Sequence, residues 1–116
     1  MASVAYLTTG SSLNLDRVWI NDLEAPSGCQ YENSGVIVGN LASVIRVRDS
    51  ELSNNDCSYI YSDRTPVEIK NTVFKDGQNK PYVNVVGSML SIANTTMSNA
   101  SDRRTQGRGV KCKQCS

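Results

Sequence analysis

The sequence contains no histidine, and it has only one tryptophan and one phenylalanine among its 116 residues. Without histidine the chain cannot form the Ser–His or Cys–His pair that activates many enzymatic nucleophiles. A zinc site would have to be built without imidazole ligands. A glycine-rich loop of the kind that cradles phosphate is also missing from the sequence. We therefore predict a non-catalytic protein that holds no metal and no cofactor.

The chain also lacks a large net charge and long apolar runs. Twelve basic residues oppose eleven acidic ones, which gives a net charge of +1. A nucleic-acid-binding protein would carry a basic face, so we expect no nucleic-acid partner and interpret the late basic residues, Arg108, Lys111 and Lys113, as a solvated loop. No apolar run is long enough for a membrane span, and the segment from Met1 to Leu7 does not resemble a signal peptide.

What the chain does contain is a ten-residue unit that occurs four times. The units begin at Leu13, Ile45, Val67 and Leu90, so successive starts are 32, 22 and 23 residues apart. Each unit opens with apolar–polar–apolar alternation, which predicts a strand with one buried face. No segment shows the i, i+3, i+4 periodicity of an amphipathic helix, which disfavours a helical solenoid.

Alignment of the four units produces columns of similar residues. The three apolar columns are Leu13, Ile45, Val67 and Leu90; Leu15, Val47, Ile69 and Ile92; and Ile20, Leu52, Phe74 and Met97. Between the second and the third lies a mostly polar column, which indicates a bend between two strands: Arg17, Asp49, Asn71 and Asn94. A strand-rich repeat of about 22 residues with variable loops is typical of a coiled parallel sheet. We therefore predict an all-β fold, a right-handed parallel β-helix of about four coils.

A second series of residues lies seven and nine positions before each unit and predicts an early strand in every coil. Its pairs are Val4 and Tyr6, Val36 and Val38, Ser58 and Ile60, and Pro81 and Val83. Val110 and Cys112 begin a fifth coil that the sequence does not complete. We expect residues 1–116 to form one β-helix segment without caps, which continues in a longer chain or stacks on further copies.

The four cysteines indicate an oxidising compartment. Cys29 and Cys57 both follow the third apolar column, and neighbouring rungs lie about 4.8 Å apart, so we predict a disulfide between them. Cys112 and Cys115 form a Cys-x-x-Cys pair, for which we expect a structural disulfide, either local or to a further coil. The alternatives are a zinc site, a redox motif, or a core position for Cys112. Oxidised cysteines predict an extracellular or cell-surface protein.

Two N-glycosylation motifs agree with that compartment. They are Asn94-Thr95-Thr96 and Asn99-Ala100-Ser101, and they predict a glycoprotein. The alternative for Asn94 is a stacked amide, because it shares a column with Asn71. The same alternative applies to Asn99, which lies closer to a loop.

The units Val67–Asp76 and Leu90–Asn99 resemble the short repeats of right-handed parallel β-helix proteins in the pectin-lyase-like superfamily. They are particularly similar to polymorphic-outer-membrane-protein-type surface repeats, which alternate a Gly-Gly-Ala-Ile-like strand with an apolar-x-x-Asn unit. Ser34-Gly35-Val36-Ile37 and Gly107-Arg108-Gly109-Val110 approximate the first element, and Leu52-Ser53-Asn54-Asn55 matches the second, whereas Phe74-Lys75-Asp76-Gly77 departs from it. The resemblance implies that the chain is one segment of a large extracellular protein.

The alternation also predicts an outward strip, Asn14, Arg46, Glu68 and Ser91, with an ion pair between Arg46 and Glu68 on neighbouring rungs. Polysaccharide-cleaving enzymes of the superfamily place acids and bases on such a face. The corresponding candidates here are Arg46, Arg48, Asp49, Asp63, Arg64, Glu68 and Lys70. An ordinary solvated sheet face explains the same residues.

We therefore predict a structural or adhesive segment of an extracellular β-helical rod or filament, with neighbouring coils, stacked copies or glycans as partners. The alternative is a carbohydrate-binding or carbohydrate-cleaving module, in which Trp19 and Tyr82 are the candidate sugar platforms. For both residues, packing is the alternative role. An ice- or mineral-binding surface would require a regular threonine row, and the row of Ser50, Thr72 and Thr95 is too short to indicate one.

Overall fold

The computed structural model describes residues 5–22, 35–55, 57–77, 81–98 and 109–115, and every regular element within them is a β-strand. The first coil contains β1 (Ala5–Leu7), β2 (Ser12–Asp16) and β3 (Trp19–Asn21). The second contains β4 (Gly35–Asn40), β5 (Val44–Arg48) and β6 (Glu51–Ser53). The third contains β7 (Ser58–Asp63), β8 (Val67–Lys70) and β9 (Val73–Lys75). The fourth contains β10 (Val83–Val86), β11 (Leu90–Ala93) and β12 (Thr96–Ser98), and β13 (Val110–Lys113) begins a fifth.

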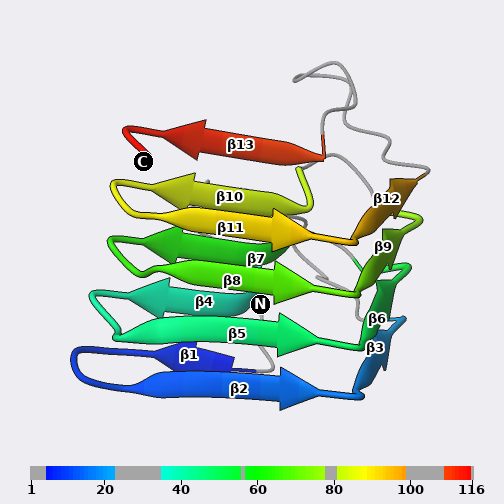
Figure 1. The fold of residues 1–116 in the computed structure, drawn as a ribbon, viewed down its shortest axis with the longest axis horizontal. Helices are drawn as coiled ribbons and strands as arrows, with labels where there is room; N and C mark the ends of the chain where they lie inside the picture. The colour runs from blue at the N-terminus through cyan, green and yellow to red at the C-terminus, as the bar shows by residue number, and fades with distance from the viewer. Residues whose placement is uncertain (1–4, 23–34, 56, 78–80, 99–108, 116) are drawn as a thin grey trace.

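The strands form three parallel sheets, one for each side of the coil (Figure 1). Sheet A has the order β1-β4-β7-β10-β13, sheet B has the order β2-β5-β8-β11, and sheet C has the order β3-β6-β9-β12. Every pairing joins a strand to its counterpart in the next coil. The chain is therefore a right-handed parallel β-helix of about four coils, as the repeat predicts. Within the described ranges no helix is long and apolar enough to cross a membrane.

The strand register confirms the three apolar columns of the repeat. Ile69 pairs with Ile92 on the next rung and with Val47 on the previous one. In the third column, Leu52 lies between Ile20 and Phe74. Side chains in the middle coils of these columns are almost completely buried, whereas those of the last coil are partly exposed. The interior is thus a stack of apolar side chains that each coil extends by one layer.

The predicted alignment of the early strands is wrong by one residue in the first two coils. Tyr6 pairs with Val38, and Val38 pairs with Tyr61, not with Ile60. The inward column of sheet A is instead Ala5, Ile37, Ile60, Val83 and Val110. The bend between sheets A and B is one residue longer in the first two coils, so a fixed count back from the unit misplaces their strands. Pro81 also falls outside β10.

The bends between sheets B and C occur at the predicted polar column. Its four residues all have positive φ: Arg17 (58°), Asp49 (52°), Asn71 (52°) and Asn94 (48°). Asparagine and aspartate tolerate this left-handed conformation better than most residues do. The bends after sheet C follow the same rule at Asp22, Asn54 and Asp76. A single left-handed residue therefore turns the chain from one sheet to the next.

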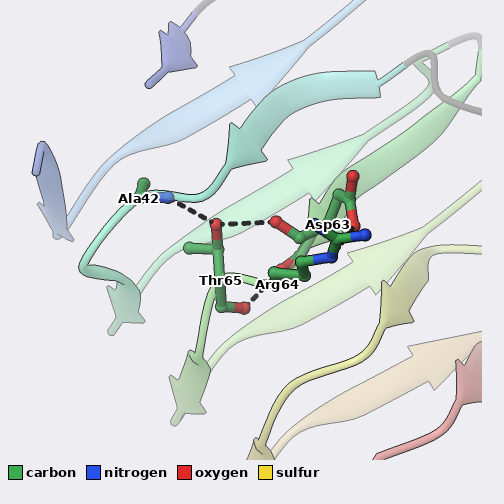
Figure 2. A network of polar contacts seen from close by, with 5 residues as sticks. Ala42, Asp63, Arg64 and Thr65 are labelled. Atoms are coloured by element: carbon green, nitrogen blue, oxygen red, sulfur yellow. Dashed lines mark hydrogen bonds and ion pairs between the residues drawn. The ribbon is translucent and has the colours of Figure 1, made fainter. Parts of the chain in front are cut away.

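A hydroxyl group after the bend replaces the hydrogen bonds that the turning backbone gives up. The Ser50 hydroxyl donates to the Arg48 carbonyl (2.7 Å) and accepts from the Val18 amide (3.0 Å) on the previous rung. Figure 2 shows the same arrangement between sheets A and B, where Thr65 Oγ1 donates to the Asp63 carbonyl and accepts from the Ala42 amide. Each hydroxyl thus satisfies two backbone groups in two coils.

Substituting Thr65 by valine tests this bridge. Valine keeps the shape of the side chain but leaves the Ala42 amide without its acceptor, so we expect the free energy of unfolding to fall by about 1–3 kcal/mol. Urea denaturation measures the change. The matched control is Thr8→Val at an exposed turn position, which we expect to change stability by less than about 0.5 kcal/mol. Equal losses in both variants would contradict a bridging role for Thr65.

Three aromatic rings fill the interior of the third and fourth coils. Tyr59, Phe74 and Tyr82 are completely or almost completely buried, with ring centroids 4.8–5.9 Å apart. Such separations are typical of favourable aromatic pairs. The three rings are therefore the largest fully buried side chains of the described core.

The two tyrosines also connect neighbouring coils through their hydroxyl groups. The Tyr59 hydroxyl accepts from the Asn55 amide (3.2 Å) and donates to the Lys75 carbonyl (2.7 Å). One coil later, the Tyr82 hydroxyl accepts from the Gly77 amide (3.0 Å) and donates to the Ser98 carbonyl. These backbone amides and carbonyls lie where the chain leaves sheet C and the hydrogen bonds between strands end. A tyrosine hydroxyl therefore serves as their hydrogen-bond partner.

Candidate functional site

The outer face of sheet B carries the predicted polar strip. Asn14, Arg46, Glu68 and Ser91 occupy equivalent positions in four successive rungs. Arg46 Nε lies 2.8 Å from Glu68 Oε2, which confirms the predicted ion pair, and both side chains are about half exposed. The strip is therefore a solvated surface in which the central carboxylate is already paired.

The candidate acids and bases are distributed over three parts of the coil. Asp63 and Arg64 lie at the bend between sheets A and B, where Arg64 Nε is 3.8 Å from Asp63 Oδ1. Asp49 lies at the bend between sheets B and C. Arg48 and Lys70 pair side by side in the column next to the Arg46–Glu68 strip. The structure brings Arg46 and Glu68 together, but it distributes the remaining candidates over the sheet face and its two flanking bends.

We expect the Arg46–Glu68 pair to contribute little to stability. Exposed ion pairs are worth about 0.2–1 kcal/mol in double-mutant cycles. A cycle of Arg46→Ala, Glu68→Ala and the double variant, measured by urea denaturation, should give a coupling energy within that range. The coupling should weaken as salt is added, because mobile ions screen exposed charges. A larger, salt-independent coupling would contradict a surface role for the pair.

The outer face of sheet C carries the one tryptophan of the chain. Trp19 lies on β3 and is 64% exposed. Its column continues on the following rungs as Glu51, Val73 and Thr96. A second outward column contains Asn21, Ser53, Lys75 and Ser98.

Two polar contacts lie on sheet C and at the bend that follows it. Glu51 Oε1 lies 3.2 Å from Lys75 Nζ, and Asn54 Nδ2 donates to Asp22 Oδ1 at 2.7 Å. The Asn54–Asp22 contact is a side-chain ladder of the type predicted for polar columns, found at a different bend. These two contacts were not predicted individually, although the shared columns of the repeat place their residues on neighbouring rungs.

Two of the candidate surface roles are ruled out. Tyr82 is only 1% exposed and packs against Tyr59 and Phe74, so it cannot serve as a sugar platform. Thr72 is buried and its hydroxyl donates to the Lys70 carbonyl, so the threonine row does not form an outward surface.

The cysteine pair at the end of the chain forms the predicted local disulfide. Cys112 and Cys115 are bonded across the bend that follows β13, with their Cα atoms 5.8 Å apart. Cys112 shares the inward column with Val85, yet it is exposed because β13 is the edge strand of sheet A. Cys57 is buried and disulfide-bonded. Cys29, its predicted partner, lies outside the described residues, so that pairing stays a prediction.

The two glycosylation motifs stay predictions as well. Asn94 is exposed at the bend between sheets B and C, at the position that Asn71 occupies in the preceding coil. The Thr95 hydroxyl donates to the Ala93 carbonyl, which repeats the bend arrangement of the preceding coils. Asn99 lies outside the described residues.

No cluster of three or more Cys, Asp or Glu side chains that could hold a metal occurs in the part of the chain that the structure describes.

Comparison with known proteins does not identify a family for the chain. No family model, no curated protein and no solved structure matches the chain.

Proposed function

We propose that the chain is a non-catalytic structural or adhesive segment of an extracellular β-helical rod or filament. The observation that carries the proposal is the in-register stack of coils, in which every strand pairs only with its counterpart in the adjacent coil. Such a solenoid elongates by one rung per coil and presents flat outer faces along its length. The pectin-lyase-like surface repeats that the sequence resembles imply the same role.

The oxidised cysteines support a place outside the cell. Cys112–Cys115 is a disulfide and Cys57 is disulfide-bonded, and such bonds persist chiefly in oxidising compartments. The exposed motif at Asn94 is compatible with glycosylation there.

The fourth coil supports stacking. Ile92 is 37% exposed, whereas Val47 and Ile69 in the same column are buried. Ile92 lies on β11, which forms the edge of sheet B. A further coil, from the same polypeptide or from a second copy, would pair with that edge and bury the side chain.

Two measurements on the native source test the proposal. Protease treatment of intact cells should remove the protein, and electron microscopy should show elongated particles. Protection inside intact cells, or isolated globular particles only, would overturn the extracellular rod.

A separate assay tests the non-catalytic assignment. Incubation with a panel of polysaccharides should yield no new reducing ends and no unsaturated products, and a catalytic product would overturn that assignment.

A further inference from the structure

Trp19 is exposed at a position where the fold does not require an aromatic ring. The three large rings of the described core are Tyr59, Phe74 and Tyr82, and all three are buried. In the next coils the position of Trp19 is taken by Glu51, Val73 and Thr96, so the coil forms without aromatic side chains there. The indole is 64% exposed and is not part of the core cluster.

The surroundings of the indole are polar, and both nearby carboxylates, Glu51 and Asp22, contact a polar or charged partner. Asn21 lies two residues along β3 on the same face, about 7 Å away by strand geometry. Glu51 pairs with Trp19 on the next rung, about 4.8 Å away, and its charge is balanced by Lys75. At the adjoining bend, Asn54 donates to the Asp22 carboxylate. The face therefore combines one open aromatic ring with amide and carboxylate groups that are already partly paired.

We propose that this Trp19 face, formed by Trp19, Asn21, Asp22, Glu51 and Asn54, binds neutral oligosaccharides of gluco-configured pyranose rings. A ring with equatorial hydroxyls has two flat C–H faces that pack on an indole, while its hydroxyls reach amide and carboxylate groups at the rim. Asp22 and Glu51 against Lys75 leave one net negative charge on the face, which disfavours an anionic sugar and leaves a neutral one as the better ligand. The inference names a ligand class for the adhesive role, and it rests on that proposed function.

Other ligands fit the same residues less well. A protein partner requires a broad apolar centre, and the other apolar residue in the outward columns of sheet C is Val73, half-buried and two rungs away. A quaternary ammonium group is bound by a cage of several rings. Tyr6, the other exposed ring among the described residues, lies on sheet A.

The single tryptophan makes the test direct, because all indole fluorescence comes from the proposed site. The chain is titrated with cello-oligosaccharides and chito-oligosaccharides, and we expect a saturable change in emission with Kd of about 1 mM. Ligand-observed NMR measures the variants, and Trp19→Ala should weaken binding by about tenfold or more, which corresponds to about 1.4 kcal/mol. Trp19→Phe should retain part of the affinity, and Asn21→Ala should lose several-fold.

Tyr6→Ala is the matched control, since it removes an equally exposed ring from another sheet and should leave the affinity unchanged. Urea denaturation shows whether each variant remains folded. Absence of a saturable emission change with either sugar series, or binding that Trp19→Ala leaves intact, would overturn the site. Such failure leaves the rod itself in place, whereas a cleaved oligosaccharide would contradict the non-catalytic role and not the binding face.

Discussion

Replacing Phe74 by alanine is expected to lower the free energy of unfolding by about 3–5 kcal/mol, a large part of the stability of a small domain. Phe74 is fully buried on β9 and contacts the rings of Tyr59 and Tyr82. Its removal leaves a cavity that the stacked layers above and below cannot fill, because each is held in place by its own three strands. Urea denaturation followed by circular dichroism measures the loss.

Val73→Ala is the matched control for this substitution. Val73 lies on the same strand but points to the outer face of sheet C and is half-buried. We expect its loss of stability to be no more than about 1 kcal/mol. If the two substitutions had equal effects, β9 would not be divided into an inner and an outer face, and the coil described above would be wrong.

Alkaline pH is expected to destabilise the protein through Tyr59. Burial, the largest cause, raises the pKa of the Tyr59 phenol from 10.0 to about 12, because the buried ring disfavours the charged phenolate. The pKa of Tyr82 is raised for the same reason. Because the folded state holds the proton more tightly than the unfolded state does, this contribution to stability is complete below pH 10 and is lost as the pH rises toward about 12. A shift of this size corresponds to about 3 kcal/mol.

Urea denaturation at a series of pH values measures the loss, and Tyr59→Phe removes the titrating group. That variant should have a flatter pH profile above pH 10, together with a loss of about 1–3 kcal/mol at neutral pH, because both hydrogen bonds of the Tyr59 hydroxyl are removed. Tyr6→Phe, at an exposed ring, should leave the wild-type profile unchanged. A Tyr59→Phe profile as steep as that of the wild type would show that another group controls alkaline unfolding.

Much of the fold was predictable because side chains alternate along a strand and similar residues stack between coils. The positions of Leu52, Phe74 and Ile69 follow from that rule alone. The ion pair between Arg46 and Glu68 follows from the same columns. Sequence periodicity fixes which face a residue occupies wherever the unit itself is regular.

The rest depends on features that the repeat does not contain. The predicted alignment of the early strands is wrong by one residue because the bend before Ile45 is longer than the bend before Val67. Tyr82 looked as suitable for the surface as Trp19, since it lies immediately before its strand, where alternation does not assign a face. Its burial arises from contacts with Tyr59 and Phe74. Those contacts join residues from different coils and strands, which no local pattern specifies.

The recurrence of equivalent positions has a consequence for how such a chain changes length. Val67 and Leu90 occupy the same place in successive turns, as do Phe74 and Met97. An in-frame duplication or deletion between two such positions would add or remove one complete turn while every remaining ladder keeps its partners. Gene segments that encode this protein can therefore expand or contract by whole turns, with the outer faces free to diversify independently of the ladder that supports them.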